Sequence, residues 1–384
     1  MVIARPRGRG PAFAVAVAAG AAAAWGCTMT STTSYGAWTG DSSADGAAPR
    51  PHADAGAPTG PLRDAGPAPP ASADGSPHDG EPWDDASSEA GGDAPDGGPP
   101  PPAQPVVLAS GLSWPFGVAV DASWVYWANE TGGSVMRVPI AGGAPQIIAS
   151  GLGTPVEVAL DGTSVYWTEY AAGYVSKAPI GGGAVTRLVI AQAPLALAVD
   201  ATHVYWGQYA GAGAVYRQAH DGSGLQLLAA SQNQPFAMAS DGTNLYFTDT
   251  GSGAVVRVPV AGGQTTSLVV GAGALGGIAV DGVNAYFAAT AGDEVQSVPL
   301  GGGMSSPVAV SQSSPMGVAV DGKYVYWASS ASGEIWKAPV GGGAPTRLAS
   351  GQATPGCVAV DATNVYWTNV APMTNTGSVM KVAK

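Results

Sequence analysis

The stretch GVAVDASWVYW at residues 117–127 recurs as GVAVDGKYVYW at residues 317–327. Related stretches between and after these copies place an aspartate at the end of an apolar run every 39 to 41 residues. The seven aspartates are Asp121, Asp161, Asp200, Asp241, Asp281, Asp321 and Asp361. A fixed period of about 40 residues indicates a repeat architecture in which each unit packs on its neighbours.

Each unit contains four short β runs separated by turn residues. An aromatic pair in the second run begins five residues after the aspartate, and Gly-rich gaps and turns lead to a third run such as 135–139 and a fourth such as 346–349. The pairs are Tyr126-Trp127, Tyr166-Trp167, Tyr205-Trp206, Tyr246-Phe247, Tyr286-Phe287, Tyr326-Trp327 and Tyr366-Trp367. Four strands in about 40 residues is the period of a propeller blade, so we predict an all-β, seven-bladed β-propeller over residues 105–384.

The small residue inside every first run supports this fold. Alanine occupies the same position in all seven units: Ala119, Ala159, Ala198, Ala239, Ala279, Ala319 and Ala359. First strands crowd around the axis of a propeller, where a small side chain fits the taper. The aromatic pair on the second strand would then fill the wider space between blades farther out.

The two ends of the repeat region complement each other. The seventh unit ends at Lys384, directly after its third run, and lacks a fourth. The first apolar run, VVLASG at residues 106–111, matches the fourth-strand sequence TRLASG at 346–351. We therefore predict that the N-terminal strand completes the last blade and closes the ring, which leaves no long unpaired edge between the first and last blades.

The motif sequence also resembles a known family. An Ala-Val-Asp run, a Tyr-Trp-Thr run and a Lys/Arg-Val-Pro run follow in the order of the YWTD repeats of low-density-lipoprotein-receptor-type propellers, and the pattern is similar to NHL-type propellers. The best matches are Tyr166 to Glu169 and Tyr246 to Asp249. The receptor propellers have six blades, whereas seven units are present in this chain. The resemblance implies the fold, and it implies protein binding or, in some relatives, enzymatic activity.

The N-terminus has the features of an export signal. Arg5, Arg7 and Arg9 precede an Ala-rich apolar stretch at 11–24, which is too short for a transmembrane helix. Gly26 directly before Cys27 resembles a bacterial lipobox, in which the cysteine is lipidated and becomes the first residue of the mature chain. We therefore predict an exported protein anchored to a membrane through Cys27. Ordinary secretion with a free Cys27 is the alternative.

Residues 28–104 have the composition of a disordered tether. Ala, Gly, Pro, Ser and Asp dominate, and ten Asp and two Glu stand against two Arg. Such a segment has too little apolar surface to offset the entropy lost on ordering. The predicted domains are therefore a signal peptide at 1–27, a tether at 28–104 and the propeller at 105–384.

The chain carries a formal net charge of −12 and no basic stripe, which argues against nucleic acid as a partner. Cys27 and Cys357 are the two cysteines, so lipidation of Cys27 would leave no disulfide and packing would have to hold the fold. We expect a monomer whose partner is a protein, a peptide or a glycan.

Sequence motifs for catalysis are lacking. The seven aspartates are followed by Gly or Ala between two strands, where an aspartate accepts hydrogen bonds from the turn backbone, so we assign them to turns rather than to calcium binding. His203 and His220 have no nucleophile at a known spacing. Cys357 replaces a repeat glycine and is expected to be a buried thiol. We predict no catalytic residue, no metal and no cofactor.

Positions that break the repeat are the candidates for function. They gather in the loops after the second strands and at the entries to the first strands, which meet at one face of a propeller. The candidate ligand-binding residues are Phe116, Glu157, Glu169, Tyr170, Gln208, Tyr209, Phe236, Asp249 and Met316. Apolar side chains, two tyrosines and several carboxylates around a central depression suit a peptide or a glycan.

Three classes of function remain open. We favour a binding or scaffolding module displayed at the cell envelope. A propeller enzyme of the lyase or lactonase type is the first alternative, and it would need a metal or a histidine at the channel mouth. A structural element of the envelope without a discrete ligand is the second.

Overall fold

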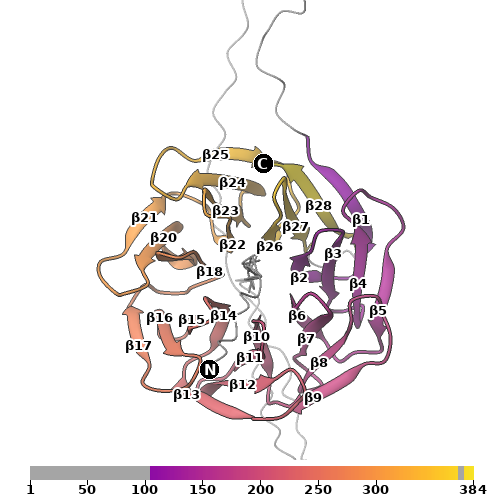
Figure 1. Cartoon of the computed structure of the whole chain (residues 1–384). Coiled ribbons are helices and arrows are strands. Elements are labelled where there is room, and N and C mark those ends of the chain that lie inside the picture. The colour runs from indigo at the N-terminus through magenta and orange to yellow at the C-terminus, as the bar shows by residue number, and fades with distance from the viewer. Residues whose placement is uncertain (1–103, 371–375) are drawn as a thin grey trace, which may run out of the picture. The chain divides into compact units, whose positions relative to one another are not determined.

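The computed structural model describes residues 104–370 and 376–384, which form seven four-stranded antiparallel sheets around one axis (Figure 1). The predicted all-β, seven-bladed propeller is confirmed. The predicted signal peptide with Cys27 and residues 28–103 of the predicted tether lie outside the described residues. Within the described ranges, no helix has the length and apolar character of a membrane span.

The strands of each blade follow one another from the axis outward (Figure 1). The first strands are β2 (Pro115–Val120), β6 (Pro155–Leu160), β10 (Pro194–Val199), β14 (Pro235–Ser240), β18 (Ile278–Val280), β22 (Pro315–Val320) and β26 (Pro355–Val360). The second strands are β3 (Trp124–Asn129), β7 (Ser164–Glu169), β11 (His203–Gln208), β15 (Asn244–Asp249), β19 (Asn284–Ala289), β23 (Tyr324–Ser329) and β27 (Asn364–Asn369).

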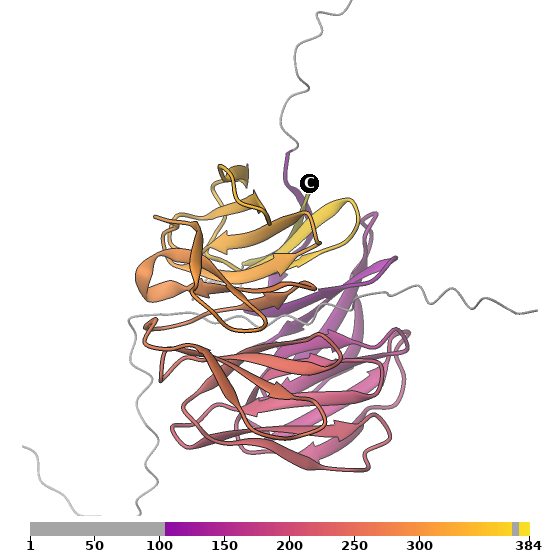
Figure 2. The ribbon, with the colours of Figure 1, turned by 60° about the vertical axis from the view of Figure 1, so that its left-hand side comes forward.

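The outer two strands complete each sheet, and the sheets twist as in other propellers (Figure 2). The third strands are β4 (Ser134–Pro139), β8 (Tyr174–Pro179), β12 (Gly213–Ala219), β16 (Ala254–Pro259), β20 (Glu294–Pro299), β24 (Glu334–Pro339) and β28 (Gly377–Ala383). The fourth strands are β5 (Gln146–Ser150), β9 (Thr186–Ile190), β13 (Gln226–Gln232), β17 (Thr266–Val269), β21 (Ser306–Ala309), β25 (Thr346–Ala349) and, for the seventh blade, β1 (Val106–Leu112). A 3-10 turn, η1 (Thr290–Gly292), follows β19.

The first strands are packed tightly around the axis, as the repeated alanines predict. All seven of these alanines are buried. A Cβ atom on Gly117 would lie 2.8 Å from the Cα of Glu157 in the next blade, so the backbones of β2 and β6 approach closely because this position is glycine. Farther out, the tyrosine and the Trp or Phe of every aromatic pair are at most 1% exposed and fill the space between blades.

The ring is closed by the N-terminal strand, as predicted. β1 pairs antiparallel with β28, with Val107 opposite Met380 and Ser110 opposite Ser378 (Figure 1). The hydroxyl of Thr368 on β27 also donates a 2.8 Å hydrogen bond to the carbonyl of Phe116 in the first blade. The last blade is therefore joined to chain segments from both ends of the propeller.

The seven repeated aspartates hold the turns between first and second strands. Oδ1 of each aspartate accepts hydrogen bonds from the backbone N–H groups two and three residues later, at 2.6–2.9 Å. Each aspartate N–H also donates to the carbonyl three residues on. The predicted turn role of these residues is confirmed.

The second carboxylate oxygen of each aspartate accepts a hydrogen bond that the sequence analysis did not predict. The hydroxyl of the tyrosine five residues later, on the second strand, donates to Oδ2 at 2.6–2.9 Å in all seven blades. We call this set of bonds the Asp–Tyr clasp. It ties the turn at the end of the first strand to a buried aromatic ring, and it satisfies a phenol that the core would otherwise leave unpaired.

Basic side chains on the third strands tie neighbouring blades together. Each donates to a carbonyl in the turn after the third strand of the next blade. The four bonds are Arg137 Nη1 to Ile180 O at 2.5 Å, Lys177 Nζ to His220 O at 2.7 Å, Arg257 Nη1 to Leu300 O at 2.7 Å and Lys381 Nζ to Ile140 O at 2.5 Å. Charge-assisted bonds of this kind are stronger than neutral ones, so they fix the spacing between blades.

Truncating one side chain of the closing strand tests the closure. Leu108 is 6% exposed and neighbouring Val107 is 55% exposed on the same strand. We expect Leu108→Ala to lower the free energy of unfolding by about 2–4 kcal/mol, because it leaves a cavity in the core. Val107→Ala should change it by less than about 0.5 kcal/mol. Urea unfolding measures both, and equal effects of the two changes would contradict the closure.

The clasps also predict alkaline unfolding. Burial raises the pKa of all seven clasp tyrosines, and the carboxylate beside each raises it further, for Tyr286 to about 12. Unfolded tyrosines ionise near pH 10. The native state therefore binds more protons above about pH 10, and the free energy of unfolding falls from there as the pH rises, by up to about 1.4 kcal/mol per pH unit for each tyrosine.

Urea unfolding at a series of pH values measures this slope. Tyr286→Phe should reduce the dependence of the unfolding free energy on pH by the contribution of one tyrosine, because one phenol fewer ionises on unfolding. Absorbance spectroscopy of the native protein follows the ionisation of its tyrosines directly. Clasp tyrosines that ionise near their ordinary pKa would contradict the prediction that the native state keeps them protonated.

Candidate functional site

The two ends of the propeller carry different loops. Loops that leave the second strands and loops that enter the first strands lie at one end, which we call the entry face. The turns after the first strands and after the third strands lie at the other end, which we call the Asp face because it carries the seven clasp aspartates. The predicted ligand-binding residues all belong to the entry face.

An unusual backbone conformation fixes the loops of the entry face. The residue before the proline that begins the first strand has a φ of 42–63° in six blades: Trp114, Thr154, Ala193, Gln234, Ser314 and Thr354. Its carbonyl accepts the backbone N–H of the residue that follows the second strand, at 2.9–3.2 Å. A left-handed non-glycine residue is energetically costly, and here it points a carbonyl at the neighbouring loop and holds that loop in place.

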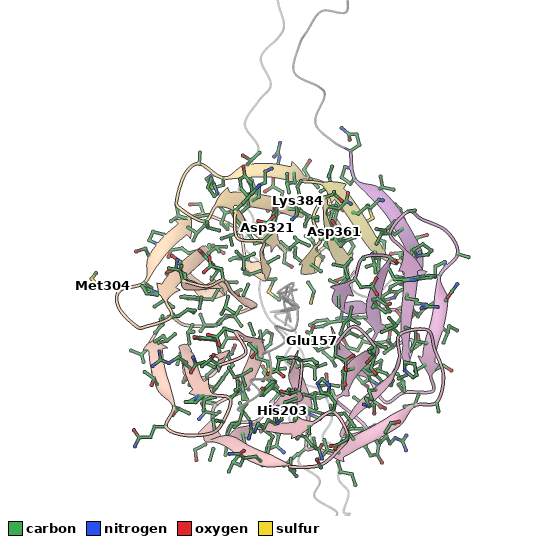
Figure 3. All side chains as sticks on the ribbon, viewed as in Figure 1. Glu157, His203, Met304, Asp321, Asp361 and Lys384 are labelled. Atoms are coloured by element: carbon green, nitrogen blue, oxygen red, sulfur yellow. The ribbon has the colours of Figure 1, made fainter. Side chains whose placement is uncertain are left out.

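Four of the predicted residues lie on first strands and are buried. Phe116, Phe236 and Met316 are at most 6% exposed, and Glu157 is fully buried. Glu157 lies near the middle of the ring (Figure 3), on β6, and its Oε1 would be 2.8 Å from a Cβ on Gly117. Its backbone N–H donates to the Thr168 hydroxyl at 3.2 Å. These four residues therefore lie in the core beneath the entry face rather than on its surface.

Two predicted carboxylates lie below the surface. Glu169 is 1% exposed, and its carboxylate accepts hydrogen bonds from Trp167 Nε1 at 3.2 Å, Ser176 Oγ at 2.8 Å and the backbone N–H of Gly153 at 3.1 Å. Asp249 is 5% exposed and accepts the Ser252 hydroxyl at 2.8 Å, and burial raises its pKa. Both side chains thus support the loops from within.

Aromatic side chains gather on the entry face across three consecutive blades. The ring of Tyr209 packs edge-on against Phe236, with centroids 6.0 Å apart. Burial raises the pKa of Tyr209, and neighbouring Tyr170 raises it further. Tyr170 is 37% exposed, and Tyr209 and Gln208 are partly exposed. We call Tyr170, Tyr209 and Phe236 the aromatic cluster.

Glu130 is an entry-face carboxyl that was not among the predicted site residues. It follows the second strand of the first blade, the repeat position that Tyr170 and Tyr209 occupy in the next two blades. Burial raises the pKa of Glu130 to about 7, so the group changes charge near neutral pH. Its repeat position is the sequence signal that could have identified it.

The two histidines of the described residues lie at the Asp face. His203 Nδ1 is 2.7 Å from the Thr202 hydroxyl, and burial lowers the pKa of its ring. His220 Nδ1 lies 3.2 Å from Asp161 Oδ2, and its ring is 5.2 Å from that of Tyr166. Across residues 104–370 and 376–384, no group of three or more His, Cys, Asp or Glu side chains has the arrangement of a metal site.

No protein-family model matches the sequence, and no curated protein is detectably similar to it. Solved structures are similar in fold. Virginiamycin B lyase from Staphylococcus aureus is 14% identical with a TM-score of 0.63, over 73% of this chain and 99% of that chain. A catalytically inactive histidine-to-alanine variant of that lyase with quinupristin is 13% identical with a TM-score of 0.62, over 73% and 99%.

A computationally designed protein, Ika8, is 14% identical with a TM-score of 0.53, over 71% of this chain and 98% of that chain. At these identities the similarity shows the propeller fold alone.

Proposed function

We propose that this chain is an exported binding module that holds a protein, a peptide or a glycan on its entry face. The observation that supports this most strongly is the aromatic cluster. Tyr170 and Tyr209 remain partly exposed although every tyrosine and Trp or Phe of the repeated aromatic pairs is buried. Exposed aromatic rings on a rigid base are typical of binding hot spots.

The surroundings of the cluster suit recognition. The left-handed residues before β6 and β10 fix the loops that carry Tyr170 and Tyr209. A preformed surface of this kind loses little entropy on binding. Glu130, in the adjacent blade, adds a carboxyl that is protonated or charged near neutral pH and can therefore donate or accept a hydrogen bond.

A propeller lyase is the second candidate, because the fold is similar to that of virginiamycin B lyase. The two described histidines lie on the Asp face, away from the aromatic cluster, so this candidate rests on the fold alone. Incubation with quinupristin followed by liquid chromatography and tandem mass spectrometry distinguishes the two. A new isomer with the fragments of a linear chain would establish lyase activity, and recovery of unchanged quinupristin would argue against it.

The export part of the proposal rests on the N-terminal sequence. Three arginines, an Ala-rich apolar stretch and Gly26-Cys27 are the features of a lipoprotein signal. A lipid on Cys27 and a long Pro/Ala/Gly/Asp-rich tether would hold the propeller at a distance from the membrane. The entry face would then be displayed to partners in the envelope.

Changing the two exposed tyrosines tests the binding function. We expect Tyr170→Ala with Tyr209→Ala to abolish capture of partners from an envelope extract, because a hot-spot tyrosine contributes about 2 kcal/mol or more. The matched control is Val283→Ala with Met304→Ala, which removes two side chains of 67% and 89% exposure outside the entry face. Unchanged melting of both variants confirms the fold, and undiminished capture by the tyrosine variant would refute the proposal.

The membrane anchor has its own test. Cys27→Ser should move the protein from the membrane fraction to the soluble fraction and abolish labelling with palmitate, because the thiol is the site of acylation. The control Cys357→Ser changes the other cysteine, which is buried in β26. Membrane association that survives the loss of Cys27 would contradict the lipid anchor.

A further inference from the structure

A cavity of the propeller opens on the axis at the Asp face, opposite the face proposed to bind the partner. Its volume is about 720 Å³, and residues from all seven blades line it. Pockets of this size accommodate small organic molecules. The cavity is formed by the ends of the first strands and the turns that follow them, which the clasps hold in place.

The wall of the cavity is apolar. The residue directly before each clasp aspartate contributes to it in every blade: Val120, Leu160, Val199, Ser240, Val280, Val320 and Val360. Ser240 is the one polar member, and its hydroxyl accepts the N–H of Gly242 within its own turn. Alanines of the first strands complete the wall. A ligand that fills this space must therefore have an apolar body.

The mouth of the cavity favours a positively charged group on the ligand. Asp200, Asp241, Asp281, Asp321 and Asp361 line it. Burial alone would raise the pKa of Asp200 and Asp361, but hydrogen bonds from the tyrosine and the turn amides outweigh it, and the pKa of both lies below its usual range. Carboxylates around a low-dielectric opening concentrate a negative potential there.

One cation of the chain itself, Lys384, approaches one of these carboxylates. Lys384 Nζ lies 2.5 Å from Oδ2 of Asp321 while the hydroxyl of Tyr326 still donates to that oxygen at 2.8 Å (Figure 3 labels Asp321, Asp361 and Lys384). Burial raises the pKa of Asp321, but the hydrogen bonds from this lysine, the turn amides and Tyr326 outweigh it and lower the pKa to about 2. A clasp aspartate can therefore accept an ammonium group without releasing its tyrosine.

We propose that the axial cavity binds a small hydrophobic amine, with its apolar body among the valines and its ammonium group at the carboxylate mouth. A fatty acid with the same number of carbon atoms as the amine would place its negative charge beside five carboxylates, which repel it. A neutral alcohol would gain the apolar contacts alone. The order of affinity is therefore amine, alcohol and then carboxylate, and this order is independent of the proposed function of the entry face.

Calorimetric titration of the full chain with octylamine, octanol and octanoate tests the proposal. We expect octylamine to bind at least about tenfold more tightly than octanol, which corresponds to about 1.4 kcal/mol, and octanoate to give no measurable binding. Equal affinities of the three probes, or no binding of octylamine at millimolar concentration, would overturn the proposal.

Variants locate the site. Changing the aspartates would break clasps and unfold turns, so Ala201, which is exposed and lines the cavity, is the better position. Ala201→Arg should weaken octylamine binding by about tenfold or more through bulk and charge. Val283→Arg, in the turn after Asp281 but outside the cavity lining, should leave it unchanged. Equal effects of the two changes would show that octylamine binds elsewhere.

Removing the lysine beside the mouth should strengthen octylamine binding instead of weakening it. Lys384→Gln should tighten octylamine binding by about twofold or more, because it removes a positive charge that competes for Asp321. Weaker binding in this variant would contradict the assignment of the ammonium group to the mouth.

Discussion

The Asp–Tyr clasp is the interaction on which the rest of the propeller depends. One carboxylate fixes the turn between the first two strands through backbone amides and fixes the core through the hydroxyl of a buried tyrosine. The large aromatic core is possible because every buried phenol in it has an acceptor. Hydrogen bonds to a charged group are worth about 1.5–3 kcal/mol each, and seven such groups contribute to one fold.

The clasps also decide what each face of the propeller can do. At the Asp face they use both oxygens of every repeated aspartate, so the turns that carry these carboxylates are fixed and their negative charge is held at one end of the axis. At the entry face no such constraint exists. The residue after each second strand is free to differ, and Glu130, Tyr170 and Tyr209 occupy this position in three consecutive blades.

Much of the fold could be predicted because residues with the same structural role recur at the same position of every repeat. The aspartate spacing gives the number of blades, and the match between 106–111 and 346–351 gives the closure. The tyrosine partner of Asp121 was also visible five residues later, but a sequence does not say which way a phenol points. Only the packed structure shows that the ring lies in the core with its hydroxyl at the turn.

Less of the candidate site than of the fold could be predicted from the sequence. Glu169 and Asp249 vary from blade to blade as functional residues do, yet both are buried, since the end of a second strand faces inward toward a neighbouring tryptophan or serine donor. The left-handed residues before the strand-entry prolines carry no common side chain, so nothing in their identity predicted them. Tyr170 and Tyr209 remain partly exposed because they follow the strand rather than end it.

A double-mutant cycle on one clasp measures how much the Asp–Tyr hydrogen bond stabilises its blade. Asp281 and Tyr286 are joined by a 2.9 Å hydrogen bond and have no ion pair among the described residues. Unfolding free energies of Asp281→Asn, Tyr286→Phe and the double variant give the coupling between the two side chains. We predict a coupling of about 1–3 kcal/mol. Effects that add within about 0.3 kcal/mol would show that the clasp does not stabilise the blade.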